Sequence, residues 1–301
     1  MAMDVYIVGF ARTAFTRFSR KEPQKDDFWE LRPEEIAAIP IKALVERTGV
    51  KPEDIEELIT GTALPVGEQW LYGGRHVVFA AKLPHTIPAA HVDRQCASSI
   101  TAVATAAMEI ATGMVDMAIA GGVEKMSKTP MYQNPNIEIN PKFLTDEEYV
   151  RLYNLPIGYI MGLTAEKLAE MSKIGREDMD TWSHRSHRLA TEAYGRGYFK
   201  EEIIPTAVGG RAVDRDQSVR PDTTPEALAQ LPPAFKPDGV ITAGNSSPLN
   251  SGAAYVMLAS REAMRKYGLQ PLAKIKAVAF AGVPPDVMGT GPVPATRKAL
   301  Q

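Results

Sequence analysis

The sequence predicts an α/β fold, because short apolar runs typical of buried strands alternate with longer patterns typical of helices. Residues 4–10 (DVYIVGF) are typical of a buried strand. Residues 97–112 form an Ala-rich helical pattern, and residues 116–120 (DMAIA) form another strand pattern. The alternation of these segments along the chain indicates the α/β class.

The first sixty residues continue this alternation. The strand over residues 4–10 is expected to end near Gly9. Residues 32–35 (RPEE) predict a helix start, with proline in the first turn and acids beside the positive end of the helix dipole. Residues 51–54 (KPED) repeat that pattern ahead of residues 55–58, and residues 58–64 (LITGTAL) then predict a strand.

The next segment leads into the Ala-rich helix. Residues 89–92 are a short apolar run, followed by a polar turn over residues 93–96. The helix predicted over residues 97–112 is closed by Gly113, a residue favoured just after helix ends. The strand predicted over residues 116–120 is expected to break at Gly121-Gly122.

The character of the chain changes after Val123. Residues 124–159 show little periodicity and are too many for an ordinary loop, which indicates a subdomain or a functional excursion. The later segments are, in order, two helices over 164–172 and 176–194, an irregular stretch over 205–237, a strand over 239–242, a polar turn over 244–248, a small apolar run over 251–258, a helix over 261–267, a strand over 273–281 and a helix beginning at 295.

Composition limits the class of protein. The 301 residues suggest about two domains. The formal net charge of −2 leaves no broad basic field, so nucleic acid is not expected as a partner. One cysteine cannot form an internal disulfide or a multi-cysteine metal site. The first residues are too quickly polar for a secretory signal, and no apolar stretch reaches ~18 residues. A cytoplasmic protein that does not enter the membrane is expected.

Cys96 is the strongest candidate for chemistry. The pattern of strand, sharp turn, cysteine, small residues and helix places its sulfur at a helix N-terminus, where unpaired amides and the dipole favour a thiolate. The amide of Cys96 itself could donate to a developing oxyanion. A buried structural cysteine is the alternative, since free cysteines are among the most buried residues.

The histidines and glycine pairs give weaker signals. His184 and His187 lie three residues apart on a predicted helix, but no third metal ligand accompanies them, so a solvated helix face is the preferred interpretation. His91 precedes Cys96, although strand alternation does not place it beside the sulfur. No glycine-rich segment has the spacing of a phosphate-binding fingerprint.

The residues around Cys96 resemble the nucleophile motif of thiolases. Residues 93–99 (DRQCASS) followed by an Ala-rich helix carry this resemblance. Four further segments resemble thiolase segments in the same order along the chain: residues 121–127 (GGVEKMS), residues 161–166 (MGLTAE), residues 220–247 from RPDTT to TAGNSS, and residues 288–292 (MGTGP). The resemblance extends over nearly all of residues 4–301.

This resemblance implies a fold and a domain organisation. Thiolases consist of two similar layered α/β/α halves, with a loop domain inserted in the first half. We therefore expect an N-terminal thiolase domain over residues 1–123 and 244–269, a loop domain over residues 124–243, and the start of an incomplete C-terminal domain over residues 270–301. Homodimers or homotetramers are also implied, with the C-terminal part possibly supplied as a separate chain.

The resemblance also implies a reaction and its residues. Cys96 matches the nucleophile that attacks an acyl-CoA thioester to give an S-acyl enzyme, from which CoA or an acetyl-CoA carbanion takes the acyl group. CoA and acyl-CoA are then substrates, with no cofactor and no metal. Six residues match positions that contact CoA in the family: Arg220 and Ser247 on its polar parts, and Phe235, Ala243, Met161 and Met288 as pocket walls.

The sequence departs from the family pattern at four positions, which concern substrate length and affinity. Ser99 stands where glycine is usual, Ile160 where short-chain members often carry histidine, Ala227 for a frequent serine, and Ser251 for a frequent aspartate.

A larger departure concerns the second half of the family pattern. An asparagine in Asn-Glu-Ala-Phe, a histidine in Gly-His-Pro and a second cysteine do not occur in these 301 residues. In thiolases that histidine activates the nucleophile, and the second cysteine carries a proton for the other substrate. We therefore expect the N-terminal part of a thiolase cut short in its second half, with little turnover on its own. A non-catalytic subunit that binds CoA esters or a partner protein is the alternative, and an unrelated cysteine hydrolase is a remote third.

Overall fold

The computed structural model describes residues 4–130 and 137–301, and the chain divides into two compact units. The sheet unit contains Met1–Asn136, Tyr198–Ser218 and Leu249–Lys276. The helical unit contains Ile137–Gly197, Val219–Pro248 and Ala277–Gln301. This division follows packing and places residues 198–218 with the sheet, so the domain boundaries expected from the family resemblance stay a prediction.

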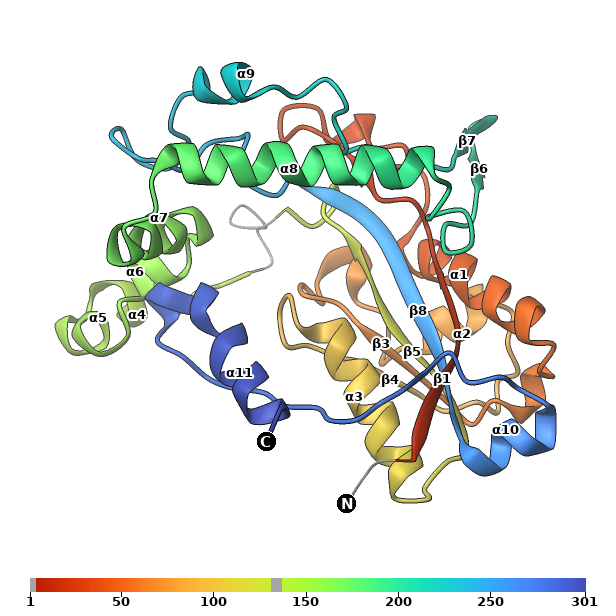
Figure 1. The fold of residues 1–301 in the computed structure, drawn as a ribbon. Helices are drawn as coiled ribbons and strands as arrows, with labels where there is room; N and C mark the ends of the chain where they lie inside the picture. Colours follow the sequence, from red (N-terminus) through yellow and green to blue (C-terminus); the bar gives the residue numbers. More distant parts are fainter. Residues whose placement is uncertain (1–3, 131–136) are drawn as a thin grey trace. The chain divides into compact units, whose positions relative to one another are not determined.

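The sheet unit is built on a mixed sheet that has seven strands within the described residues (Figure 1). Its order is β4-β3-β5-β8-β1-β9, with β2 paired to β8 beside this path. The strands are β1 (Val5–Arg12), β2 (Thr16–Arg17), β3 (Glu57–Gly61), β4 (Ala89–Val92), β5 (Met117–Lys125), β8 (Asn250–Ser260) and β9 (Ala273–Lys274). β4, β3 and β5 run parallel, so the carboxyl ends of these three strands meet at one edge of the sheet.

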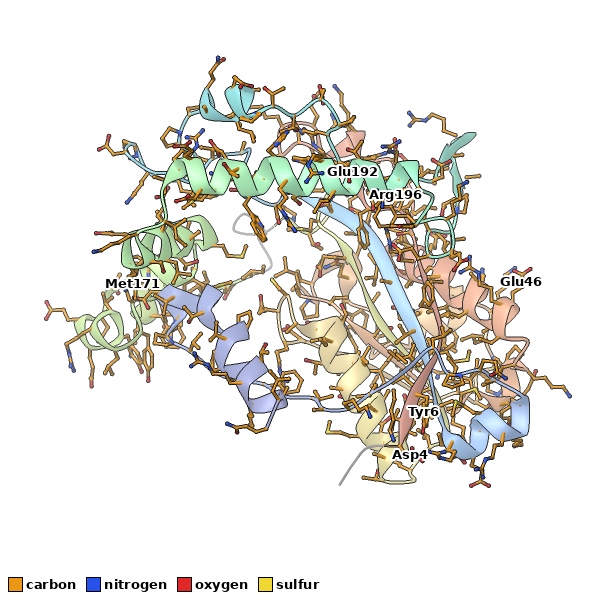
Figure 2. The ribbon with its side chains drawn as sticks, in the orientation of Figure 1. Asp4, Tyr6, Glu46, Met171, Glu192 and Arg196 are labelled. Atoms are coloured by element: carbon orange, nitrogen blue, oxygen red, sulfur yellow. The ribbon has the colours of Figure 1, made fainter. Side chains whose placement is uncertain are left out.

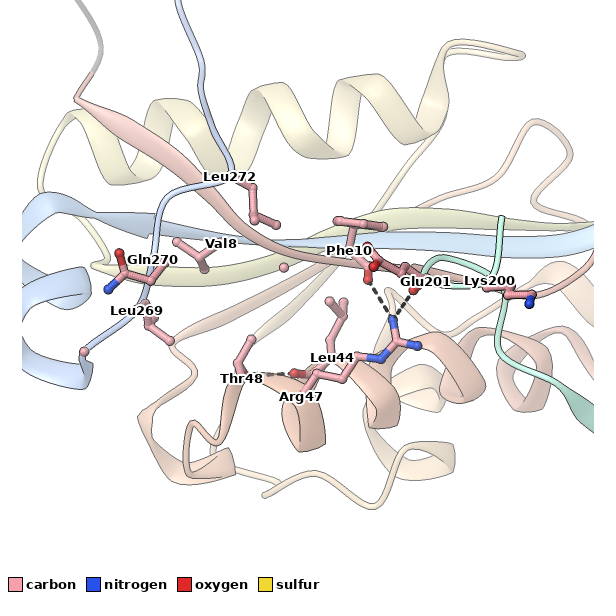
Figure 3. A pocket seen from close by; sticks show the side chains of 12 residues that line it. Val8, Phe10, Leu44, Arg47, Thr48, Lys200, Glu201, Leu269, Gln270 and Leu272 are labelled. Atoms are coloured by element: carbon pink, nitrogen blue, oxygen red, sulfur yellow. Dashed lines mark hydrogen bonds between the residues drawn. The ribbon is translucent and has the colours of Figure 1, made fainter. Parts of the chain in front are cut away.

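Helices cover both faces of this sheet, which confirms the predicted layered α/β class. Helix α3 (Ser98–Ala111) lies on one face and α1 (Pro33–Thr48) on the other, as Figure 3 shows around β1. The core under α3 consists of small and branched side chains: Val5, Ile59, Ala102, Ala106, Ala107, Ile110, Ala118, Ala120 and Leu258. The alanines let α3 approach the strands closely, so the Ala-rich sequence explains this thin layer.

Shorter elements complete the sheet unit. They are α2 (Arg75–Ala80), α10 (Arg261–Tyr267), the hairpin β6 (Thr206–Val208) and β7 (Arg211–Val213), and three 3₁₀ turns, η1 (Pro23–Lys25), η2 (Pro52–Asp54) and η3 (Gly67–Gln69). Asp4 and Tyr6 lie together at the start of β1 (Figure 2). Asp4 accepts bonds from Arg261 in α10 and Lys274 in β9, at 2.7 and 3.0 Å, and hydrogen bonding by Arg261 holds the pKa of this carboxyl well below its usual range.

The expected break at Gly121-Gly122 is wrong, because β5 continues through both glycines to Lys125 while paired to β8. A Cβ on Gly121 would come within 2.7 Å of the Cα of Tyr255 in β8. A Cβ on Gly122 would lie 2.6 Å from the Oγ of Ser99 in α3. Glycine here permits close packing of neighbouring elements rather than a turn.

Four other expectations also need correction. The first strand does not end near Gly9, because β1 continues to Arg12 while paired to β8. Residues 51–54 form only the 3₁₀ turn η2, because β3 begins at Glu57. Residues 239–242 form no strand, and only an isolated bridge joins Thr242 to Pro233. The strand expected over residues 273–281 is limited to Ala273–Lys274, since β1 offers these residues pairing only at Tyr6 and Ile7.

The helical unit consists of short helices around two longer ones. Its elements are α4 (Lys142–Thr145), α5 (Glu147–Tyr153), α6 (Leu155–Gly158), α7 (Met161–Ser172), α8 (Arg176–Gly195), α9 (Pro225–Ala229), η4 (Pro285–Thr290) and α11 (Pro292–Ala299). The predicted helix pair is confirmed as α7 and α8. η4 packs against α6 and α7, where the Asp286 carboxylate accepts bonds from Asn154 at 2.8 Å and from Lys167. Because of these bonds, η4 is fixed to the two helices.

Candidate functional site

Cys96 lies in the turn that joins β4 to α3, at the edge where the parallel strands end. Its side chain is exposed, which excludes the buried structural cysteine that the sequence left open. It stands immediately before Ala97, the N-cap of α3. The predicted order of strand, turn, cysteine and helix is therefore confirmed.

The turn itself is fixed by local hydrogen bonds. The Asp93 carboxylate accepts the backbone N–H of Gln95 at 2.8 Å, and the N–H of Ala97 donates to the Arg94 carbonyl at 3.0 Å. Gln95 has a φ of +49°, in the left-handed region that non-glycine residues rarely adopt. The residue before Cys96 is thus held in an uncommon conformation by the bonds on either side.

Ser98 ties this turn to the neighbouring strand. Its buried hydroxyl donates to the carbonyl oxygen of Thr62 at 2.9 Å and to that of Gln95 at 2.6 Å. The same Oγ accepts the backbone N–H of Arg94 at 2.8 Å. The orientation of the Cys96 backbone therefore depends on a side chain two residues further along.

Two glycines let the first turn of α3 pack directly on the sheet. A Cβ on Gly61 would lie 2.6 Å from both the Ser98 carbonyl oxygen and the Ser99 nitrogen. Gly122 likewise faces the Ser99 side chain, so the serine that departs from the family pattern fits against a glycine in β5. No flexible group stands in the way at Gly61, so any side chain there displaces the turn.

His91 lies in β4, five residues before Cys96, but its hydrogen-bond partner is Thr62. Its Nε2 is 2.8 Å from the Thr62 hydroxyl. Burial lowers the pKa of His91, and the nearby Asp93 carboxylate opposes that shift. Among the described residues, the imidazole of His91 makes no hydrogen bond to Cys96.

A half-buried carboxylate lies near the carboxyl end of β5, the third of these parallel strands. Glu124, at the end of β5, accepts the N–H of Ala63 at 2.8 Å and the side-chain amide of Gln69 at 2.7 Å. Burial raises the pKa of Glu124. Gln69 also accepts the N–H of Lys125, so this pair connects β5 to the loop that follows β3.

Asp26 forms the centre of a buried polar cluster behind this edge. Its Oδ2 accepts the hydroxyls of Ser127 and Ser251, and its Oδ1 that of Thr16, each at 2.5 Å. Ser251, which replaces a frequent aspartate, therefore donates to a carboxylate. An aspartate at position 251 would place two buried carboxylates in contact, so serine suits this chain.

The six predicted CoA contacts all belong to the helical unit, whereas Cys96 belongs to the sheet unit. Met161 begins α7 and is half-buried, and Met288 lies in η4. The other four, Arg220, Phe235, Ala243 and Ser247, lie in loops and are exposed. Each unit thus presents its own group of candidates.

Phe235 and the following loop are fixed to α7. The Phe235 ring covers Gly162 so closely that no Cβ would fit there. One helical turn later, the buried Glu166 carboxylate accepts the N–H groups of Val240 and Ile241 at 3.0 and 2.9 Å. The loop that carries Phe235 and Ala243 is therefore attached to α7 at two points.

The next part of this loop is fixed to α8. Asn245 accepts the N–H of Thr242 at 2.8 Å and donates to the Asp180 carboxylate at 3.3 Å. Asp180 pairs with Arg176 at 2.7 Å, and Arg176 donates to the Leu231 carbonyl at 3.1 Å. These bonds hold the segment that leads to Ser247.

Arg220 lies beside the histidines of α8. Its backbone N–H donates to His187 Nδ1 at 3.3 Å. Burial, and then the positive charge of Arg220, lower the pKa of His187. Within residues 4–130 and 137–301, no group of three or more His, Cys, Asp or Glu side chains is arranged to hold a metal ion. Across the same residues, no helix is long and apolar enough to span a membrane.

Sequence reasoning missed the residues that position the candidates. Glu166, Asp180 and Asp26 are buried acids in otherwise ordinary stretches of sequence, and only the fold shows which N–H and O–H groups donate to them. Gly61 carried a signal in principle, because a glycine at the end of a strand often marks a close approach of backbone.

Sequence comparison links the chain to one family of known proteins. Residues 5–262 match the family model described as thiolase, N-terminal domain. The chain is 39% identical over 314 residues to a 3-ketoacyl-CoA thiolase of Bacillus subtilis (strain 168), with 99% of this chain and 76% of that protein covered. It is 39% identical to a beta-ketoadipyl-CoA thiolase of Pseudomonas knackmussii, with 100% and 77% covered.

A solved structure gives the same result. The human mitochondrial 3-ketoacyl-CoA thiolase in complex with CoA superposes with a TM-score of 0.85 at 33% identity. The match covers 100% of this chain and 76% of that one.

Proposed function

The chain belongs to the thiolase family of acyltransferases, and from that premise we propose that Cys96 is the residue that carries the acyl group. The reaction is acyl transfer to or from CoA, in thiolytic cleavage of a 3-ketoacyl-CoA or in condensation of acetyl-CoA. CoA and its thioesters are substrates here, and the reaction needs no cofactor and no metal.

The observation that carries this proposal is the placement of Cys96. It is an exposed cysteine in a rigid turn directly before a helix, at the carboxyl edge of three parallel strands. Ligand sites of α/β proteins occur preferentially at such edges.

The proposed step conserves atoms and charge. The Cys96 thiolate attacks the thioester carbonyl, a sulfur–carbon bond forms, and the bond to the CoA sulfur breaks, so that CoA leaves as a thiolate. In the second half-reaction a new CoA thiolate, or the carbanion of acetyl-CoA, attacks the same carbonyl and releases Cys96. The acyl chain therefore changes partner without net oxidation or reduction.

We assign binding of CoA to the surface of the helical unit. Arg220 supplies a cation for phosphate and Ser247 a hydroxyl, while Met161, Met288, Phe235 and Ala243 supply apolar walls for the pantetheine arm. The bonds of Glu166 and Asp180 to the loop over residues 232–248 support this assignment, since they fix the segment that presents three of these residues.

The direct experiment is acylation by acetyl-CoA, followed by the intact mass of the protein. The native chain is expected to gain one acetyl group, localised to Cys96 by peptide mapping, and Cys96→Ala is expected to gain none. Ser99→Ala is the matched control, because it changes an exposed neighbour and leaves the sulfur in place.

The same experiment separates the two functions considered. If the native chain binds CoA but is never acylated, the non-catalytic CoA-ester-binding subunit is the correct alternative. Acylation that persists in Cys96→Ala would contradict the role of the cysteine itself.

We further propose that full turnover requires groups that these 301 residues do not contain. The 301 residues include one cysteine and five histidines. None of these histidines stands in the Gly-His-Pro context that the family resemblance implies for the base. Without a base, turnover is expected to fall by ~10²-fold or more. Rapid turnover by the mass-verified 301-residue chain alone would overturn this.

Assembly and location belong to the same proposal. We propose a homodimer or homotetramer, possibly with a separate C-terminal chain, in the cytoplasm, with no nucleic acid and no membrane as partner. A net charge of −2 and a single cysteine support it.

A further inference from the structure

A groove on the sheet unit, outside the Cys96 site, has the properties of a small-molecule site. It lies along the outer edge of β1, between that strand, the end of α1 and the segment that follows α10 (Figure 3). Its volume is about 660 Å³, within the range that ligand pockets occupy. β1 and β4 are on opposite sides of the sheet order, four strand positions and roughly 20 Å apart at ~4.8 Å per strand, so this groove is separate from the Cys96 edge.

The groove lies beside a stretch of β1 whose outer edge has no backbone pairing among the described residues. The residues before and after this stretch are paired. The Ile7 carbonyl accepts the N–H of Leu272 at 2.9 Å, and the N–H of Arg12 donates to the Glu202 carbonyl at 2.8 Å. Backbone groups two residues apart in a strand point to the same edge, so Phe10 directs its N–H and C=O into the gap. A polar backbone edge is thus available to a ligand.

The floor of the groove is apolar and tightly packed. Leu44 is fully buried and Val8 almost so, and Leu269 is half-buried beside them. Gly9 keeps this floor low, because a Cβ there would lie 3.1 Å from Leu44 and 3.2 Å from the Thr48 methyl group. The apolar surface that a ligand covers comes from Leu269 and from the exposed Leu272, which also line the groove, and its burial drives binding.

The rim carries a positive charge that is held in place. The Nη1 of Arg47 donates to the Glu201 carbonyl at 2.6 Å and to the Phe10 carbonyl at 3.4 Å. Both partners are neutral, and in the described part of the chain no carboxylate forms an ion pair with Arg47. Its Nε and Nη2 donors accordingly have no protein acceptor within residues 4–130 and 137–301. Lys200 and Glu201 are exposed residues that also line the groove, and they add one charge of each sign to its rim.

We propose that this groove binds a small carboxylate with an apolar body, such as a medium-chain carboxylic acid. The guanidinium side that Arg47 leaves unused matches a planar carboxylate with two parallel N–H···O bonds. The acyl body lies against Leu269 and the exposed Leu272, above the buried Val8 and Leu44. The site is independent of acyl transfer at Cys96.

The test is titration of the protein with octanoate, followed by calorimetry. The native chain is expected to bind one octanoate saturably, with a Kd of about 1 mM or lower. Arg47→Gln is expected to weaken binding at least about tenfold, since a hydrogen bond to a charged group is lost. Arg265→Gln is the matched control, because Arg265 is an exposed arginine of α10 that does not line the groove.

Three outcomes would overturn the proposal. The first is no saturable binding of octanoate to the native chain, and the second is equal affinity in the Arg47→Gln and Arg265→Gln variants. The third is equally tight binding of 1-octanol, which has the same body but no carboxylate.

The location of the site is checked independently with methyl NMR spectra. Octanoate is expected to shift the methyl signals of Leu44, Leu269 and Leu272. Shifts confined to Met161 and Met288 would place the acid at the proposed CoA surface instead and would also overturn the proposal. Because Arg47 is exposed, its variant is expected to fold, and an unchanged remainder of the spectrum verifies this.

Discussion

The two candidate surfaces of the molecule are held by different kinds of interaction. The Cys96 turn is positioned by backbone packing, with the first turn of α3 lying directly on Gly61 and Gly122. The loop over residues 232–248 is instead held by buried side-chain acids, Glu166 and Asp180, which reach out from α7 and α8 to its N–H groups.

The two kinds of interaction differ in how tightly they fix the segment they hold. At Gly61 the turn is in contact through main-chain atoms, which cannot rotate away, so its conformation is tightly constrained. A loop held by hydrogen bonds to carboxylates can open when one bond is lost, while its helices stay folded. The rigid arrangement suits a reacting sulfur, and the adjustable one suits a long, flexible ligand.

The largest effect is expected from Gly61→Ala. Its Cβ would lie 2.6 Å from the backbone of Ser98 and Ser99, so α3 must move away from β3. We expect a loss of about 3 kcal/mol or more in the free energy of unfolding, measured by urea denaturation. Gly195→Ala is the control, because nothing lies within 4 Å of that position, and it should be neutral. Equal stability of the two variants would show that packing against glycine does not fix the turn.

A smaller effect is expected from Ser98→Ala. The buried carbonyl of Thr62 and the N–H of Arg94 both lose a partner, which costs about 1–3 kcal/mol of stability. Acylation of Cys96 should slow more than it does in Ser99→Ala, because the turn is released. The rate of acylation at a temperature where both variants are fully folded is the deciding measurement.

In the helical unit, Glu166→Gln is expected to act locally. The glutamine keeps one oxygen that can accept an N–H. Its NH2 group replaces the other oxygen and cannot accept, so the hydrogen bonds from Val240 and Ile241 are not both kept. Hydrogen exchange at residues 240 and 241 should accelerate by ~10-fold, with less than about 1 kcal/mol change in global stability. Glu170→Gln, on an exposed position of the same helix, should leave exchange unchanged. Global unfolding instead of local opening would contradict the contrast between the two surfaces.

The smallest effect is a dependence of stability on pH, from His91 in one unit and His187 in the other. Burial lowers the pKa of both in the folded protein below the ordinary 6.5. Below pH 6.5 the unfolded chain therefore binds protons that the folded chain does not, and stability falls as the pH falls towards the lowered values. His91→Gln and His187→Gln should each remove part of this slope in thermal unfolding. An unchanged slope in the double variant would exclude these two histidines as its source.

The sequence allowed much of the fold to be predicted, because periodicity and helix caps are local signals. Pro33 and Gly113 correctly marked a helix start and a helix end. Gly121 and Gly122 misled for a physical reason: glycine serves turns and close packing equally, and only the partner strand distinguishes them. The predicted strand after Ala273 failed because its length is set by what β1 offers, which no local pattern contains.

The candidate site was predictable in part. Cys96 stood out by its position between a strand and a helix. The acids that hold the CoA loop could not be predicted, because Glu166 and Ile241 lie far apart in sequence and meet only in the fold. The groove at β1 depends on Arg47, Phe10 and Glu201, three residues without any shared motif.

The position of β8 has a consequence for how the protein is made. The chain leaves the sheet at Lys125 and returns at Asn250, yet β8 then lies between β5 and β1. On the ribosome, β1 is synthesised first but has no strand to pair with until β8 has emerged from the exit tunnel. We expect its apolar side chains and its open edge to stay exposed throughout that interval, which favours binding by chaperones. The time taken to translate residues 125–260 is then expected to set how long the nascent chain is exposed to aggregation.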